Sequence, residues 1–183
     1  VELVLGPTHL ECKHSNINIS RVESANEMYK VVSSKFKNSD ISIFAAAVSD
    51  YTSNEVAKNK IKKIGDSLTI DLSKTTDILS EMGNSKKENQ FVVGFALESE
   101  NEFENAKLKL EKKNLDMIVL NSLNNKGAGF EHNTNQVTII DKQNNIKNFE
   151  LKDNRIVGEV SLNQGSLPIV LFSKNGYISI KAY

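Results

Sequence analysis

The stretch Ile41-Ser42-Ile43-Phe44-Ala45-Ala46-Ala47-Val48 decides the fold of this chain of 183 residues. It is as long as a strand and rich in apolar residues without clear alternation, which is typical of a parallel strand covered on both faces. Three other short runs have the same character and lie at Glu2 to Leu5, Phe91 to Leu97 and Asp116 to Leu120. The sequence therefore predicts four buried parallel strands.

Helical patterns lie between some of these strands. The first is predicted from Ala25 to Phe36, opened by Ser24 with Glu27 three residues later, the spacing of a capping box. A second helix is expected to start near Asp77, and a third to run from Glu102 to Lys113 with one apolar stripe. Strands alternating with helices predict an α/β fold with a Rossmann-like, doubly wound and mostly parallel sheet.

The later part of the chain is predicted to be rich in β-hairpins. Gln136 to Asp141 and Ile146 to Leu151 flank four polar residues and form the first predicted hairpin. Ile169 to Ser173 and Tyr177 to Lys181 flank Asn175-Gly176, a dipeptide that favours a tight hairpin turn.

Composition narrows the classes of function. The 23 basic and 23 acidic residues give a net charge of zero, which argues against a general nucleic-acid or membrane-surface binder. No apolar run reaches the ~18 residues of a membrane-spanning helix. The only cysteine, Cys12, cannot form an internal disulfide, and no signal peptide is visible at the start. These features predict a cytoplasmic location.

Candidate ligand-binding residues follow the deciding strand. Ala46 and Ala47 leave room for a flat group or a close backbone approach, and Asp50 follows where α/β sheets place ligand-contacting side chains. The Asp50 carboxylate could hold a ribose hydroxyl, a base amine or a metal-bound water. The alternative is tight helix packing over the alanines with Asp50 as a capping residue.

The segment Lys58-Asn59-Lys60-Ile61-Lys62-Lys63 carries four lysines in six residues. Such a cluster suits a polyphosphate, because ammonium groups can neutralise a triphosphate and its leaving pyrophosphate. A solvated loop is the alternative for any run of charge.

Three further features fit a nucleotide site, each with a structural alternative. Thr75-Thr76-Asp77-Ile78 reads as a helix start, whose backbone amides attract anions or are simply capped. Phe95, in Val93-Gly94-Phe95-Ala96-Leu97-Glu98, could stack on a base or belong to the core. Lys109 and Lys113 are four residues apart, so they could share a helix face toward one phosphate chain or simply face solvent.

The inventory of nucleophiles and metal ligands is short. The three histidines have no metal-ligand spacing, Cys12 has no Cys-x-x-Cys partner, and no nucleophile elbow occurs. No protein ligand to a metal is therefore predicted. The expected chemistry is electrostatic activation without a covalent enzyme intermediate. A dinucleotide-dependent oxidoreductase is disfavoured because the sequence has no G-x-G-x-x-G fingerprint.

Eight motifs occur in order along the chain: Val4 to Thr8, Val22 to Met28, Ala46 to Tyr51, Lys60 to Lys63, Thr76 to Leu79, Val93 to Glu98, Lys113 to Asp116 and Gly129-Phe130. Together they resemble the phosphopantothenate–cysteine ligase (phosphopantothenoylcysteine synthetase) domain. In bacteria that domain is commonly the C-terminal half of a bifunctional coenzyme A biosynthesis flavoprotein.

The resemblance implies a reaction and roles for the candidate residues. CTP, with Mg²⁺, would activate the carboxylate of 4′-phosphopantothenate as an acyl-cytidylate, and cysteine would then attack and release CMP. Ala46, Ala47 and Asp50 would lie against the nucleotide, and Lys60 would also act in the attack on the acyl intermediate. The remaining nucleotide contacts would be Thr75, Thr76, Asp77, Ile78, Phe95, Lys109 and Lys113. The sequence leaves CTP against ATP open.

The resemblance also implies a division of the chain. Residues 1–151 correspond to the ligase domain, without the family's opening strand, glycine-rich turn and asparagine, which we expect upstream of Val1. Residues 152–183 are expected to form a β-hairpin tail of unknown role. FMN is expected only if an upstream decarboxylase half exists. A homodimer, or a higher oligomer with that flavoprotein half, is expected. The alternative function is a non-catalytic nucleotide-binding or dimerisation fragment.

Overall fold

The computed structural model describes residues 1–9, 11, 14–57, 59–62, 66–124 and 134–153, and the backbone of three strands after residue 157. Cys12, Lys58, Lys63, the Gly129-Phe130 motif and the Asn175-Gly176 turn lie outside the described residues. The chain forms two compact units, one of residues 1–38 and 46–81 and one of residues 39–45 and 82–183. Each unit is considered by itself.

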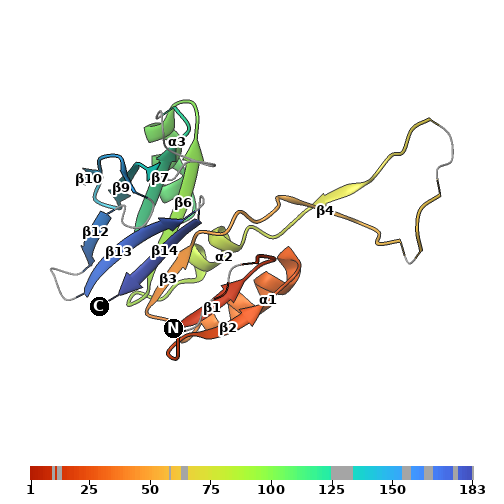
Figure 1. Cartoon of the computed structure of the whole chain (residues 1–183), viewed down its shortest axis with the longest axis horizontal. Helices are drawn as coiled ribbons and strands as arrows, with labels where there is room; N and C mark the ends of the chain where they lie inside the picture. Colours follow the sequence, from red (N-terminus) through yellow and green to blue (C-terminus); the bar gives the residue numbers. More distant parts are fainter. Residues whose placement is uncertain are drawn as a thin grey trace. The chain divides into compact units, whose positions relative to one another are not determined.

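The second unit is built on a five-stranded sheet (Figure 1). Its strand order is β10-β9-β7-β6-β3, with bounds Ile146–Asn148, Val137–Asp141, Met117–Ser122, Phe91–Glu98 and Ile41–Phe44. Strands β3, β6 and β7 are parallel, while β9 and β10 form an antiparallel hairpin on β7. The α/β fold class and the first hairpin are thereby confirmed.

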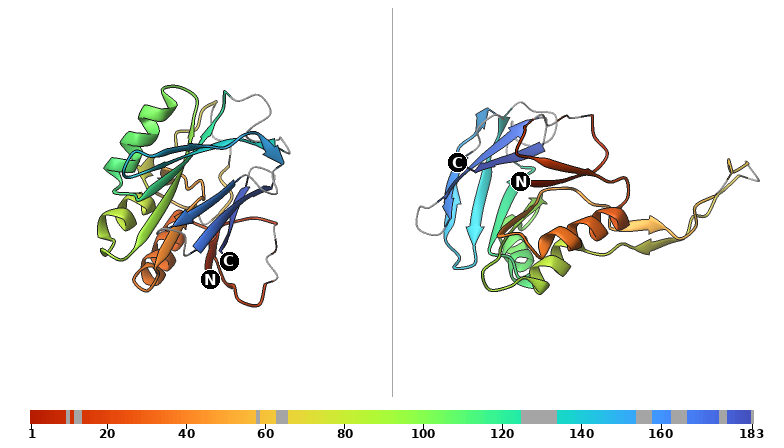
Figure 2. Two further views of the ribbon diagram at one scale, coloured as in Figure 1. Left: turned by 90° about the vertical axis from the view of Figure 1, so that its left-hand side faces the viewer. Right: turned by 90° about the horizontal axis from the view of Figure 1, so that it is seen from below.

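Both faces of this sheet are covered. Val93, Met117, Val119, Val137 and Ile139 form a buried cluster with Phe149 on one face. Ile118 and Leu120 alternate with these residues along β7, point to the opposite face and are also buried. Helix α3 (Glu102–Lys112) packs on β6 and β7 there with its apolar stripe, Ala106 and Leu110 (Figure 2). The continuous apolar runs of β6 and β7 are explained by this double coverage.

Strand β3 is shorter than its apolar run. It ends at Phe44, and the alanines Ala45 to Ala47 continue without strand pairing and are exposed. The expectation of a strand up to Val48 was therefore wrong. Alanine has too little side chain to bury against a neighbouring strand, so the run's apolar character does not extend the ladder.

The first unit begins with a pair of parallel strands, β1 (Glu2–Leu5) and β2 (Asn18–Arg21). Helix α1 follows at Ala25–Phe36, the predicted bounds, and the Ser24 hydroxyl accepts a hydrogen bond from the Glu27 amide as the capping box predicts. The prediction of a fully buried β1 was wrong. Glu2 is exposed, the rest of the strand is half-buried, and its partner β2 was not predicted.

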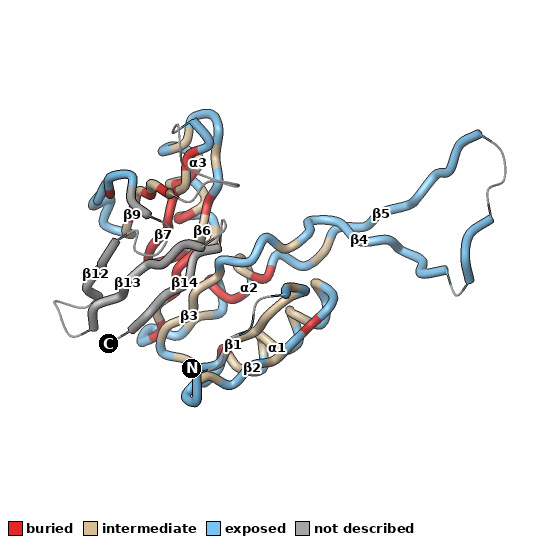
Figure 3. The backbone as a smooth tube through the Cα atoms, in the orientation of Figure 1, coloured by how far each residue is buried: buried red, intermediate tan, exposed pale blue. Residues whose placement is uncertain are grey.

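A two-stranded antiparallel ribbon follows in the same unit. It pairs β4 (Tyr51–Ser53) with β5 (Leu72–Lys74), and every described residue from 51 to 74 is exposed (Figure 3). Neither strand was predicted, because each has only three residues and no buried face. The described lysines of the predicted lysine cluster lie in irregular backbone between the two strands.

Helix α2 (Ile78–Ser85) meets the end of α3 at a close backbone contact. Gly83 lies so near this end that a Cβ atom at Gly83 would be 1.9 Å from the Lys113 carbonyl oxygen. Asn114 has φ 49° and donates from its side chain to the Gly83 carbonyl at 2.9 Å. The amides of Asn114 and Leu115 bond to the carbonyls of Glu111 and Leu110, the two bonds of a Schellman motif.

The remaining strands lie in the C-terminal part. The short strands β8 and β11, Thr134–Asn135 and Lys152–Asp153, pair antiparallel. Strands β12, β13 and β14 form an antiparallel sheet in this order, with bounds Gly158–Leu162, Leu167–Lys174 and Tyr177–Ala182. The predicted second hairpin is confirmed as the β13–β14 pair.

Candidate functional site

Two predicted segments of the first unit are joined by hydrogen bonds. The Thr75 hydroxyl donates to the Ser49 carbonyl at 2.5 Å, and the Thr75 amide donates to the Asp50 carbonyl at 2.9 Å. The first of these contacts connects residues that are 26 positions apart in the chain. The segment after β3 and the start of α2 are therefore held side by side, as a shared nucleotide site requires.

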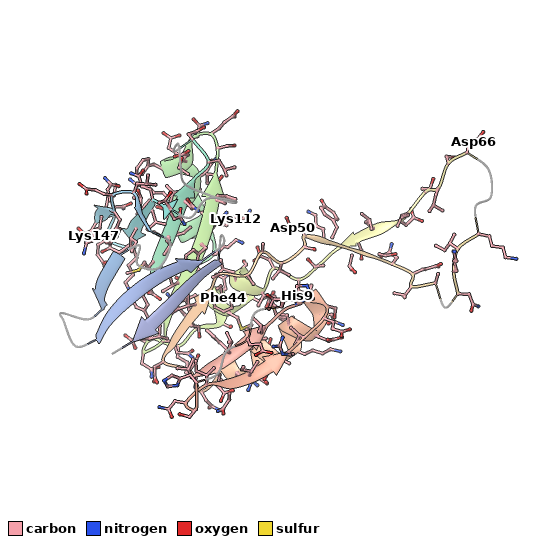
Figure 4. All side chains as sticks on the ribbon, in the orientation of Figure 1. His9, Phe44, Asp50, Asp66, Lys112 and Lys147 are labelled. Atoms are coloured by element: carbon pink, nitrogen blue, oxygen red, sulfur yellow. The ribbon has the colours of Figure 1, made fainter. Side chains whose placement is uncertain are left out.

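The side chains on this junction face solvent. Ala46, Ala47, Asp50 and Thr76 are exposed. No described residue hydrogen-bonds to the Asp50 carboxylate, and Figure 4 shows Asp50 at the base of the β4–β5 ribbon. An exposed carboxylate beside two small residues and a hydroxyl can accept hydrogen bonds from sugar hydroxyls or amino groups.

The start of α2 is capped by its own sequence. The Asp77 carboxylate accepts from the Ser80 amide at 3.0 Å, and the Asp77 carbonyl accepts from the Glu81 amide at 3.0 Å. Ile78 is 5% exposed and belongs to the core. The capping interpretation of Asp77 therefore holds, and at Ile78 only the backbone is available to a ligand.

The described lysines of the predicted cluster are Lys60 and Lys62, and both are exposed. They lie at the far part of the segment between β4 and β5, within the same unit as Asp50. Two cations on an exposed segment are available to a polyanion, although the same exposure suits a solvated loop.

The other predicted site residues belong to the second unit. Phe95 is half-buried and packs against the buried cluster of the sheet, so its ring is part of that packing. Lys109 donates to Glu98 Oε1 at 3.1 Å. Lys113 is the C-cap residue of α3, and its amide donates to the Lys109 carbonyl at 3.1 Å, one helical turn away.

A polar network at the carboxyl ends of β6 and β7 was missed from the sequence. Glu102 Oε1 accepts from the Ser122 hydroxyl at 2.5 Å and from the Asn124 side chain at 2.8 Å. Asn105 donates to Glu98 at 3.4 Å.

A pocket of about 200 Å³ adjoins the network, lined by Glu102, Phe103, Leu120, Ser122, Gln136, Thr138 and Asn148. The sequence feature that could have indicated this network is the position of Ser122 at the end of a buried strand, with Asn124 two residues later.

A buried carboxylate lies at the other end of these strands. Asp116 precedes β7 and is bonded by Lys86 at 2.6 Å, by Lys142 at 3.1 Å and by the Val92 amide at 2.9 Å. Burial by itself would raise the pKa of Asp116, but the three hydrogen bonds outweigh it and hold the pKa below its usual value. Asp116 belongs to one of the sequence motifs, but its lysine partners were not predicted. Lys86 and Lys142 are 30 and 26 residues away in the chain.

The family model described as "DNA/pantothenate metabolism flavoprotein C-terminal domain" matches residues 1–164. The chain belongs to this family. This membership confirms the resemblance seen in the sequence.

Relatives and solved structures agree with the family. The chain is 52% identical over 152 residues to "Cysteine/Cysteine sulfinic acid decarboxylase" from an unidentified prokaryote, covering 83% of this chain and 42% of that protein. It is 43% identical over 142 residues to "Coenzyme A biosynthesis bifunctional protein CoaBC" of Bacillus subtilis, covering 78% and 35%. The crystal structure of the C-terminal domain of CoaBC has a TM-score of 0.64 and 33% identity, covering 81% and 64%.

The chain spans about two fifths of the length of these curated relatives or less. Among the described residues of this family member, no three His, Cys, Asp or Glu side chains gather as a metal site. Nor does any described helix have the length and apolarity needed to cross a membrane.

Proposed function

We propose that the chain is the ligase portion of a coenzyme A biosynthesis protein. It would join 4′-phosphopantothenate to cysteine in a CTP-dependent reaction through an acyl-cytidylate. The proposal rests on the family membership and on the similarity to CoaBC proteins. Pyrophosphate leaves when the carboxylate attacks the α-phosphate, and CMP leaves when the amine of cysteine attacks the acyl carbon.

The observation that carries the proposal is the pair of hydrogen bonds from Thr75 to Ser49 and Asp50. Two segments that the resemblance assigns to the nucleotide are held together by them. The exposed Asp50 carboxylate is assigned to the sugar or base. Ala46, Ala47 and Thr76 offer small side chains and backbone to the nucleotide, and the backbone at Asp77 and Ile78 completes this part of the site.

Cationic groups would neutralise the phosphates. We assign Lys60, Lys109 and Lys113 to the triphosphate, and Lys60 also to the second half-reaction, where its ammonium would stabilise charge on the acyl intermediate. Phe95 is the assigned aromatic contact. Because its half-buried side chain packs against the core, only part of its surface would be available to a base.

The side chains present indicate which groups would hold a magnesium ion. The described residues contain no cluster of three acidic or metal-ligating side chains. Water molecules and the phosphate oxygens of the nucleotide would therefore supply most of the ligands of Mg²⁺, which usually keeps several waters. FMN would be bound only by a decarboxylase half joined to this chain.

Pyrophosphate release with CTP and 4′-phosphopantothenate tests the first half-reaction, on the chain and on its full-length gene product. In Lys60→Gln we expect release to continue while the acyl-cytidylate accumulates and the cysteine adduct falls about 100-fold. Lys62→Gln is the matched control, because Lys62 is an exposed lysine two positions away. Unchanged product formation in Lys60→Gln would reject the role of Lys60. No release by the full-length protein would reject the ligase.

The same protein preparation can be used to test three alternative functions. The decarboxylase named for the 52% identical relative predicts release of CO₂ from cysteine or cysteine sulfinic acid without CTP. A non-catalytic nucleotide-binding or dimerisation fragment predicts CTP binding or dimer formation without turnover. A nicotinamide-dependent oxidoreductase would need micromolar binding of NADPH.

A homodimer is part of the proposal. The β4–β5 ribbon exposes Tyr51, Val56, Ile61, Leu68, Ile70 and Leu72, each more than half exposed. Exposed aliphatic side chains gathered on one ribbon favour burial against another protein surface. Association of two copies is the simplest way to cover them, and in the family that the sequence resembles a β-rich segment after Gly129-Phe130 also contributes to the dimer.

A further inference from the structure

The last residue of β6, Glu98, holds its carboxylate between two side chains of helix α3. Its Oε1 accepts from Lys109 Nζ at 3.1 Å, and its Oε2 accepts from Asn105 Nδ2 at 3.4 Å. Asn105 and Lys109 are four residues apart and therefore lie on one face of the helix. The carboxylate is thus bound from two successive helical turns.

The surroundings of Glu98 fix its position further. Its carbonyl accepts from the Leu123 amide, just after β7, at 3.0 Å. Asn105 also donates to the Glu100 carbonyl at 2.8 Å, which orients its amide. The side chains of Lys109 and Glu98 are 32% and 18% exposed, so water screens the pair only in part. The Lys109 ammonium is held near the carboxyl end of β6, the edge where α/β sheets bind ligands.

Two effects of Glu98 on a bound triphosphate have opposite signs. Its negative charge repels the phosphates, so acting by charge alone it would weaken nucleotide binding. Its restraint of a long, flexible lysine side chain lowers the entropy that is lost when the ammonium meets a phosphate. Removing the carboxylate therefore distinguishes the two effects by the direction of the change in affinity.

We infer that Glu98 is a positioning residue, which holds the Lys109 ammonium where it meets the phosphates of the nucleotide. This inference rests on the proposed function, because Lys109 is a nucleotide contact only there. Glu98 acts through Lys109 and not by touching the nucleotide, and Asn105 orients its carboxylate.

Calorimetric titration of the full chain with CTP tests the inference. Glu98→Gln should weaken CTP binding about tenfold, since the lysine is released. Lys109→Met should weaken it at least as much. The double variant should bind no more weakly than Lys109→Met alone, because both changes remove one coupled pair. Glu104→Gln is the matched control, an exposed carboxylate on the same helix, and should leave binding unchanged or slightly tighter.

Unchanged or tighter binding by Glu98→Gln would overturn the inference, as would additive losses in the double variant. Absence of CTP binding by the wild type would instead reject the proposed nucleotide site. In that case acetylation of the lysines, followed by mass spectrometry, still decides whether Glu98 restrains Lys109. Lys109 should react more slowly than the exposed Lys112 in the wild type, and the difference should shrink in Glu98→Gln. Equal rates in the wild type would show that no restraint exists.

Discussion

Asp116 shows how much a single side chain contributes to the second unit. Its side chain is 4% exposed and has two lysine partners, of which Lys86 is itself only 13% exposed. Removing one member of such a group leaves a buried charge without compensation, which costs more than the pair contributes. We expect Asp116→Asn to lose about 3 kcal/mol of the free energy of unfolding at pH 7. Urea denaturation measures it, with the exposed Asp40→Asn as control.

The lowered pKa of Asp116 also predicts a dependence of stability on pH. A carboxyl whose pKa is lower in the folded state contributes stability above its unfolded pKa, and loses it as the pH falls through the folded pKa. The contribution of Asp116 should therefore be complete near pH 7 and decline below pH ~4. Denaturation midpoints measured between pH 7 and pH 3 should fall more steeply for the wild type than for Asp116→Asn. Parallel curves would contradict the assignment.

Replacing Gly83 by alanine should destabilise the protein through a steric clash. An added Cβ would lie 1.9 Å from the Lys113 carbonyl, and backbone cannot yield as a flexible side chain can. Gly83→Ala should lose about 2–3 kcal/mol of stability through strain between α2 and the end of α3. In Gly6→Ala the nearest atom would be Met28 Cε at 3.6 Å, an ordinary contact, so this control should change little. Equal thermal midpoints for both variants would refute the steric account.

At the scale of elements, helix ends were predictable where the signals are local. Ser24 and Glu27 lie within one turn of each other, so α1 could be placed at its bounds from the sequence. The strands β4 and β5 were missed because each exists only by pairing with the other across the ribbon. Three-residue strands without a buried face leave no apolar pattern to read.

The end of α3 carries a prediction at this scale. Asn114 adopts φ 49°, a left-handed conformation that residues with a Cβ rarely occupy. Asn114→Ala should destabilise the protein by about 1 kcal/mol. Asn114→Gly should cost less, because glycine accepts this conformation and loses only the side-chain bond to Gly83. Hydrogen exchange of the Leu115 amide would report the opening of this motif, and a greater loss in Asn114→Gly would argue against it.

At the scale of the whole molecule, the sequence predicted the fold class but not the contacts between residues that are far apart in the chain. The α/β class followed from four apolar runs, yet the separate pairing of β1 with β2 did not. In the candidate site, Asp50 and Thr75 were singled out individually, and their segments are joined by hydrogen bonds between residues far apart in the chain. The partners of Glu98 and Asp116 were not predicted, because the sequence does not show which of its many lysines contacts a given carboxylate.

The exposed ribbon predicts the state of association. Leu68, Ile70 and Leu72 are close together in the sequence, and each is more than half exposed. Ile70→Lys should convert a dimer into a monomer in sedimentation experiments, because a buried ammonium without a partner opposes association. Leu108→Lys places the same change on α3, where Leu108 is 63% exposed, and should leave the dimer intact. A wild type that sediments only as a monomer would refute the dimer.

The segment from Lys113 to Asp116 ends a helix, meets Gly83 and buries a carboxylate, all within four residues. None of these contacts involves Asp50 or Lys60. Lys113 is also a proposed nucleotide contact, so this short segment would serve both the fold and the binding of a ligand. A variant that lost Lys60 but kept these four residues should still fold, because none of their contacts depends on Lys60.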